Sequence, residues 1–178
     1  CDVDKENFQI DVESAKKVIT PKTKAIMPVH IYGGSVNMEE ILKFSKKYKL
    51  KVVEDAAQAL GIRFKGKSAG SFGDVSAFSF YADKAITTGE GGLIVTNNKK
   101  IYRNLLLIRN QGRIKSGSFI HNNLGYNFRF NDLLASVGLA QLKKFDSIKK
   151  RKLEIYKRFE KNLENLKEVE FFKPINKS

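Results

Sequence analysis

The chain has 178 residues, a formal net charge of +14 and 42% hydrophobic residues. This is enough for one domain with a sizeable core, or for one domain and a fragment of another, and it excludes wholesale disorder. No apolar run approaches the ~18 residues of a membrane-spanning helix. One cysteine excludes an internal disulfide and fits a reducing compartment, so we expect a cytoplasmic protein. His30 and His121 lack nearby cysteines, so we expect no metal site.

The first half of the chain has the pattern of an α/β domain. Residues 25–30, "AIMPVH", have the composition of a buried strand. The segment "NMEEILKFSKKYKL" follows, with Asn37 as the expected N-cap of an amphipathic helix. Residues 51–56, "KVVEDA", are the next strand. Strand, helix and strand at this spacing predict a βαβ unit with parallel strands.

Further strands and helices follow toward the C-terminus. Strands are expected at residues 75–80 and 91–97, and a helix at 99–108. A loop rich in glycine and asparagine runs to Asn127, and a helix is expected over 132–144. A long basic helix over 143–161 comes next, and "EVEFF" at 168–172 has the composition of a strand.

The basic helix holds much of the excess positive charge. Its apolar residues recur at roughly helical spacing, which favours a solvated helix face over a nucleic-acid surface. No basic strand rich in aromatic residues supports RNA binding. We therefore expect neither nucleic acid nor a membrane as a partner.

Two polar residues follow the second expected strand. Asp55 comes at its C-terminal end, where ligands bind in open α/β sheets, and Gln58 stands three residues on. A carboxylate at this edge can pair with a cationic ring nitrogen or a metal. Taken alone, Asp55 would be interpreted as a helix cap or a surface acid.

A serine and a lysine accompany the third expected strand. Lys84 follows that strand, and a partly desolvated lysine at a strand end is a usable amine nucleophile. Ser79, five residues earlier, has a hydroxyl that can hold a phosphate. Each has an ordinary alternative, as a solvated lysine and as a strand serine bonded to nearby backbone. The order of acid, glutamine, serine, lysine and the glycine turn "GEGG" matches the needs of pyridoxal phosphate.

Several motifs in the same order as in one family cover nearly the whole chain. They are "DVD…TKAIMPVHIYGG…VVEDAAQALG…GSFGDVSAFSFYADKAITTGEGGLIVTNN…RNQGR…GYNFRFNDLLASVGLAQL". This pattern resembles the DegT/DnrJ/StrS family of pyridoxal-phosphate-dependent sugar aminotransferases, which have the fold-type I architecture. The resemblance implies an α/β fold with a mixed, mainly parallel sheet. It also implies that residues 1–145 are part of the large cofactor-binding domain, and that 146–178 are a linking helix and the start of a small C-terminal domain.

The resemblance also assigns roles to individual residues. Lys84 is similar to the catalytic lysine that forms a Schiff base with pyridoxal phosphate. Asp55 matches the acid that pairs with the pyridine nitrogen, Gln58 the residue beside the ring, and Ser79 the serine at the phosphate. Asn127, in "GYNFRFND", is similar to an asparagine that reaches the cofactor phosphate of the neighbouring subunit. That role implies a homodimer with shared active sites. His30 is expected to have a packing role.

The implied function is transfer of an amino group from glutamate to a nucleotide-linked keto sugar. A sibling branch with histidine in place of the lysine dehydrates sugars, so Lys84 implies transamination. The "TTGEGG" loop is most similar to that of perosamine-synthase-like enzymes, which act on a GDP-linked 4-keto-6-deoxy sugar in polysaccharide biosynthesis. The alternatives are another fold-type I enzyme that acts on amino acids, and a non-catalytic basic binding domain. Family members are considerably longer, so we expect this chain to be a fragment.

Overall fold

The centre of the fold is a four-stranded sheet with the order β1-β2-β5-β6. The computed structural model describes residues 1–115, 117, 119–121, 123–172 and 175. The strands of this sheet are β1 (Ala25–Ile26), β2 (Lys51–Asp55), β5 (Val75–Ser79) and β6 (Gly92–Val95). β1, β2 and β5 are parallel and β6 is antiparallel to β5. The expected mixed, mainly parallel sheet is confirmed.

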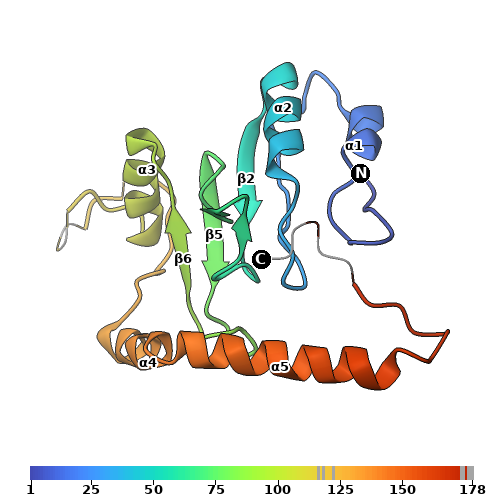
Figure 1. Cartoon of the computed structure of the whole chain (residues 1–178). Helices are drawn as coiled ribbons and strands as arrows, with labels where there is room; N and C mark the ends of the chain where they lie inside the picture. The colour runs from blue at the N-terminus through green and yellow to red at the C-terminus, as the bar shows by residue number, and fades with distance from the viewer. Residues whose placement is uncertain (116, 118, 122, 173–174, 176–178) are drawn as a thin grey trace.

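One helix covers a face of this sheet, a second stands beyond the β6 edge, and the longest runs along the lower edge (Figure 1). α2 (Met38–Tyr48) connects β1 to β2, and the Asn37 side chain accepts a hydrogen bond from the amide of Glu40, as expected for its N-cap. The remaining helices are α1 (Val12–Val18), α3 (Lys99–Arg109), α4 (Asp132–Leu142) and α5 (Phe145–Leu163). A small antiparallel hairpin is formed by β3 (Arg63–Phe64) and β4 (Lys67–Ser68).

The main core lies between α2 and the sheet. Met38, Ile41 and Phe44 of α2 are buried together with Ile26 and Val52 of the strands. These α2 residues recur at helical spacing, so one face of the helix is apolar. Ile26 and Val52 are register partners in parallel strands, so their side chains share the face that α2 covers.

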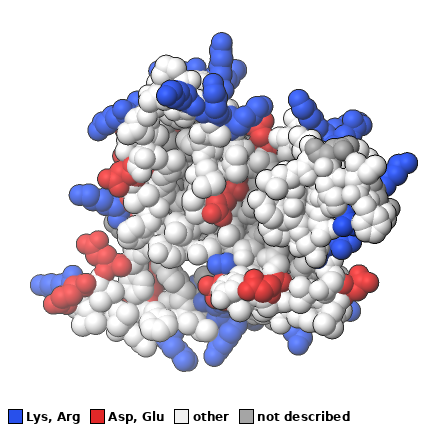
Figure 2. Space-filling model, turned by 180° about the vertical axis from the view of Figure 1, so that it is seen from behind, with Lys and Arg blue, Asp and Glu red and all other residues white. Residues whose placement is uncertain are grey.

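The opposite face of the sheet is largely open. Successive side chains of a strand alternate between the two faces of a sheet. The strand residues next to the core residues therefore point to this open face. Met27, Ala77 and Ile94 on this side are exposed. In the view from behind, Lys and Arg lie mostly at the margins (Figure 2). This open face is the one that carries Asp55.

The C-terminal segment differs from the sequence-based expectation. Residues 168–172 form no strand. Instead, Phe171 packs edge-on against Tyr156 of α5, and Phe172 stacks on Phe8. Ring contacts fix this segment without a neighbouring strand, so composition alone gave the wrong prediction. The boundary expected at 145/146 coincides with the start of α5, and its assignment as a domain boundary stays a prediction.

No helix among the described residues is both long enough and apolar enough to cross a membrane.

Candidate active site

The site lies at the carboxyl ends of β2 and β5. These strands are parallel and adjacent, with Asp55 as the register partner of Ala77. Paired residues in neighbouring strands point to the same face, and so does Ser79, two residues beyond Ala77. Asp55 and Ser79 therefore share the open face at the edge of the sheet where α/β proteins bind ligands.

A small pocket brings three of the sequence-predicted residues together. Gln58, Ser79 and Lys84 all line it. The rest of its wall consists of apolar side chains: Ala57, Leu60, Ala85 and Ile86. The pocket has a volume of only about 20 Å³, but it combines an amine, a hydroxyl and an amide with apolar surface and shares residues with a larger cleft of about 400 Å³. Together, the two have the size and the mixed lining of a site for a small organic ligand.

Lys84 is held at this pocket by local structure. Its amide donates to the Tyr81 carbonyl at 3.1 Å, which makes a tight turn after β5. Its ammonium lies 3.1 Å from a carboxylate oxygen of Asp83, and its side chain is 19% exposed. A lysine that is mostly buried and open to a pocket can reach a ligand there. Sequence reasoning did not find its partner Asp83, although the pair is adjacent in "ADK".

Asp55 and Gln58 are fixed by the loop that follows β2. The Asp55 Oδ1 accepts a hydrogen bond from the amide of Ala57 at 3.0 Å. The other carboxylate oxygen of Asp55, Oδ2, accepts no hydrogen bond from any residue that the structure describes. The Gln58 Oε1 accepts from the amide of Tyr32 at 3.0 Å, which leaves its NH₂ group available. Asp55 does not line the small pocket. The strand register instead places Asp55 beside the pocket, on the same face of the sheet as Ser79.

Ser79 keeps a donor available for a ligand. Its Oγ accepts a hydrogen bond from the amide of Tyr81 at 3.2 Å. The hydroxyl proton is then free to point elsewhere, because a hydroxyl both donates and accepts. A phosphate oxygen is a suitable acceptor for it.

The glycine turn after Lys84 packs against another segment. Gly91 has φ 141°, a conformation that glycine adopts readily and other residues rarely do. A Cβ at Gly91 would lie 2.5 Å from the Phe130 ring. The glycine therefore permits close contact between this turn and the segment before α4.

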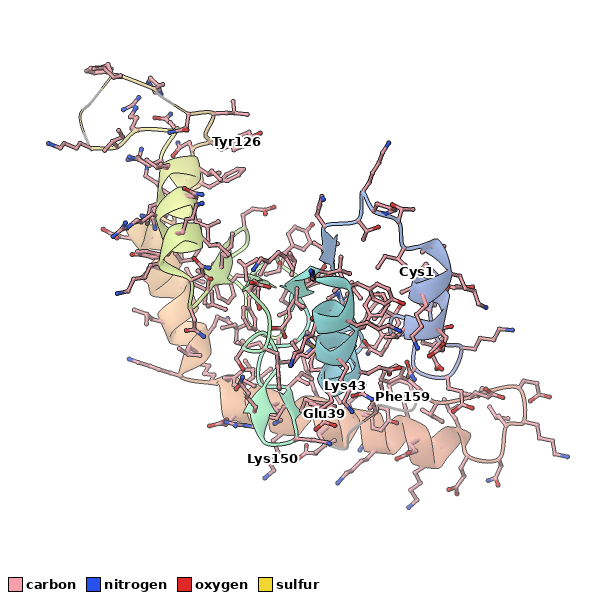
Figure 3. All side chains as sticks on the ribbon, turned by 90° about the horizontal axis from the view of Figure 1, so that it is seen from above. Cys1, Glu39, Lys43, Tyr126, Lys150 and Phe159 are labelled. Carbon is pink, nitrogen blue, oxygen red and sulfur yellow. The ribbon has the colours of Figure 1, made fainter. Side chains whose placement is uncertain are left out.

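Asn127 is not among the residues that line the pocket of its own chain. It forms an isolated antiparallel bridge with Asn110, just after α3, and is exposed. The neighbouring Tyr126 lies at the far end of α3, away from the centre of the molecule (Figure 3). The Asn127 side chain accepts a hydrogen bond from Arg129 Nε at 3.3 Å.

A second polar cluster on the opposite face is centred on Glu54. This residue is fully buried. Its carboxylate accepts hydrogen bonds from the amides of Gly70, Phe72 and Gly73, from the Ser76 hydroxyl and from His30. Burial acts to raise the pKa of Glu54, but the hydrogen bonds from His30 and the three amides outweigh it and lower the pKa.

His30 is a structural member of this cluster. Its Nδ1 accepts a hydrogen bond from the amide of Val36 at 3.1 Å, so the ring proton is on Nε2. Nε2 donates to Glu54 at a distance of 3.0 Å. The ring thereby ties the loop before α2 to β2, in agreement with the packing role expected for it. The sequence did carry a signal for Glu54, because "VVED" alternates and places this acid on the same face as Val52.

A larger cleft of about 400 Å³ adjoins the small pocket and shares Gln58, Leu60, Lys84 and Ala85 with it. It extends to Gly33, Gly61 and Ile62, and to three residues of α5. Those α5 residues were not predicted as site residues. Within the described ranges, no group of three or more His, Cys, Asp or Glu side chains is placed to hold a metal ion.

Known proteins have a similar fold and a related sequence. The GDP-perosamine synthase of Escherichia coli O157:H7 is 45% identical over 168 residues, which cover 94% of this chain and 46% of the relative. The structure of Helicobacter pylori PseC, an aminotransferase involved in pseudoaminic acid biosynthesis, matches with a TM-score of 0.86 and 34% identity over 93% of this chain and 45% of that one. The E. coli GDP-4-keto-6-deoxy-D-mannose-3-dehydratase with bound hydrated PLP matches with a TM-score of 0.80 and 30% identity, over 93% and 47%.

The chain thus spans less than half the length of these relatives. The similarity in structure confirms the fold-type I class expected from the sequence. A model of one family matches residues 1–177. The chain belongs to the DegT/DnrJ/EryC1/StrS aminotransferase family.

Proposed function

We propose that the protein is a pyridoxal-phosphate-dependent aminotransferase that moves an amino group from glutamate to a nucleotide-linked 4-keto-6-deoxy sugar for glycan biosynthesis. Membership of the family and the named relatives support this proposal. The observation that carries it is the pocket lined by Gln58, Ser79 and Lys84, with Asp55 on the same face of the sheet. The lone cysteine fits a reducing compartment, and we place the enzyme in the cytoplasm.

The residues present fit the cofactor. Lys84 supplies the amine that binds its aldehyde carbon, and the Ser79 hydroxyl supplies a donor for its phosphate. The apolar Leu60, Ala57 and Ile86 suit the ring. The open carboxylate oxygen of Asp55 is suited to the ring nitrogen, and Gln58 lies between these groups and the loop at Tyr32. When bound, pyridoxal phosphate supplies an electron sink that depends on a protonated ring nitrogen.

Each of these residues then has a task in the reaction. The negative charge of Asp55 favours the protonated ring nitrogen. Once its amine is free of the cofactor, Lys84 Nζ would take the proton from the α-carbon of bound glutamate and would give a proton to the sugar carbon that receives the amine, first as base and then as acid. Asp83 lies close enough to orient the Lys84 ammonium. The apolar wall limits access of water to the pocket.

A second copy of the chain completes the proposed site. α4 and the segment before it expose many large apolar side chains, and a helix that is apolar on all sides is normally buried. They include Leu124, Phe128, Leu133, Val137, Leu139 and Leu142. Asn127 lies within this surface. We propose that the surface is a homodimer interface and that it brings Asn127 to the cofactor phosphate of the partner.

The test is a loss of covalent cofactor binding together with a loss of turnover. Wild-type protein from the complete reading frame should show a visible absorption band with pyridoxal phosphate, and borohydride should fix the cofactor to the peptide containing Lys84. Lys84→Ala should lose both, and Lys65→Ala, at an exposed lysine, should keep both. Product analysis with a panel of nucleotide keto sugars then tests the substrate. Attachment at a different lysine, or turnover of amino acids alone, contradicts the proposal.

The interface has its own test. Analytical ultracentrifugation should give a dimer for the wild type and a monomer for Leu133→Glu/Leu139→Glu. A wild-type monomer with full activity contradicts shared sites.

A further inference from the structure

Part of the wall of the larger cleft belongs to α5. This helix contributes Phe145, Lys149 and Lys152, which are spaced as i, i+4 and i+7 and therefore lie on one face of the helix. α5 runs across the lower edge of the sheet, beneath the ends of β2 and β5 (Figure 1). Two lysines that are distant in sequence from the predicted site thus border the same cleft as Lys84.

The start of α5 is fixed against the loop that follows β2. A Cβ at Gly61 would lie 2.6 Å from the tip of the Phe145 ring, so the ring packs directly on the glycine backbone. Gly61 has φ 80°, which also favours glycine. This contact sets the position of the first turn of α5, and Lys149 and Lys152 follow on the same face one and two turns later.

The charge in the cleft is unbalanced. Lys84, Lys149 and Lys152 line it, and Asp83 is its one carboxylate in the described part of the chain. Asp83 is already paired with Lys84. In that same part, no carboxylate lies within 4.0 Å of Lys149 or Lys152, although their neighbour Arg151 pairs with Glu154. Two unpaired ammonium groups on one wall attract an anion with more than one charge.

The position of this pair separates it from the cofactor phosphate. Ser79 lines only the small pocket, and Lys149 and Lys152 line only the larger cleft. Lys84, Gln58 and Leu60 border both. A ligand that occupied the cleft would therefore have its reactive part near Lys84 and its anionic part against α5. A nucleotide-linked sugar has this form, because a diphosphate joins its sugar to its nucleoside.

We propose that Lys149 and Lys152 bind the diphosphate of the nucleotide-linked substrate, an inference that rests on the function proposed above. They are specificity residues that select a diphosphate-linked sugar over a free sugar or an amino acid. The competing source of the same chemistry is the phosphate of the cofactor, and the experiment separates the two.

The test measures binding of GDP and UDP, as diphosphate probes, to the holoenzyme by isothermal titration calorimetry. The matched pair of variants is Lys149→Gln/Lys152→Gln and Lys150→Gln/Lys157→Gln. The second pair removes the same charge from the same helix at residues that do not line the cleft. Figure 3 shows where Lys150, one of the two control residues, lies on α5. The first variant should bind the better of the two probes about tenfold more weakly, and the control should stay within about twofold of the wild type.

Two further measurements identify the ligand. The KM for the nucleotide sugar should rise with the Kd of the probe, and the wild-type Kd should weaken as salt is added because the ion contacts are screened. The cofactor Kd and the KM for glutamate should not change. Unchanged probe affinity in the cleft variant overturns the proposal, as does a loss of cofactor affinity, which would assign the lysines to the cofactor phosphate.

The outcomes also separate this inference from the proposed function. A protein that aminates no nucleotide sugar but loses probe affinity only in the cleft variant refutes the function and retains the diphosphate site. A protein that aminates nucleotide sugars equally well in both variants retains the function and refutes the site.

Discussion

Glu54 and Asp55 are adjacent acids on one strand with opposite surroundings. Glu54 points to the covered face of the sheet, is fully buried and accepts five hydrogen bonds. Asp55 points to the open face and accepts one, from its own loop. The alternation of a strand thus gives two carboxylates different tasks. One holds the 70–73 loop and His30 in place, and the other keeps an oxygen available for a ligand.

The largest expected effect is a loss of stability when the buried acid, Glu54, is changed. Glu54→Gln replaces a carboxylate that only accepts by an amide that also donates, so at least one of the five donors loses its partner. We expect the free energy of unfolding to fall by about 3 kcal/mol, measured by urea titration at pH 7.

Ser76→Ala is the matched control for Glu54→Gln. It removes one donor and keeps the charge, so it should cost about 1 kcal/mol. Equal losses for Glu54→Gln and Ser76→Ala would show that the carboxylate is not the centre of the cluster.

The corresponding change on the open face, at Asp55, should lower activity and leave stability unchanged. Asp55→Asn keeps the size of the side chain and its hydrogen bond to Ala57 but removes the charge proposed to face the ring nitrogen. We expect turnover to fall about 100-fold, or about 2.7 kcal/mol in activation free energy, with cofactor still bound. The free energy of unfolding should change by less than about 0.5 kcal/mol. Unchanged turnover would remove Asp55 from the proposed mechanism.

The sequence made the open face easier to predict than the covered one. The βαβ pattern placed Asp55 at a strand end with Gln58 three residues on, and Ser79 and Lys84 accompanied the next expected strand. Their order and the family resemblance predicted that they share one site. The partners of Glu54 lie in the 70–73 loop and at His30, and no local pattern predicts that these segments meet at one carboxylate. Lys149 and Lys152 were equally hidden, because α5 has many cations and its sequence does not show which face meets the cleft. The strand expected at 168–172 was wrong because ring contacts replace strand pairing there.

Lowering the pH should destabilise the fold through two carboxylates whose pKa is lowered, Glu54 and Asp74. For Glu54, burial opposes ionisation, but the hydrogen bonds from His30 and the amides lower its pKa; for Asp74, burial is likewise outweighed by Lys51 and the Val52 amide. A lowered folded-state pKa stabilises the fold above the unfolded-state value, which is about 4 for these side chains, and the stabilisation disappears as the pH falls through the folded-state pKa. Stability should therefore decline below about pH 5.

Urea midpoints measured at several pH values test this dependence. Glu54→Gln removes one of the two groups, so its curve should be flatter than that of the wild type. Parallel curves would contradict the assignment to Glu54.

The smallest effect is expected where an acid is neither fully buried nor part of the site. Asp74 accepts hydrogen bonds from Lys51 at 2.8 Å and from the Val52 amide at 3.0 Å, and the Lys51 side chain is 68% exposed. Lys51→Met removes only a solvated ion pair, so unfolding free energy should change by less than about 1 kcal/mol and turnover should not change. Asp74→Ala also removes the acceptor of the Val52 amide and should cost more. If Lys51→Met cost as much as Glu54→Gln, charge pairing alone would explain both sites, and the hydrogen bonds that distinguish the covered face would not be the source of its stability.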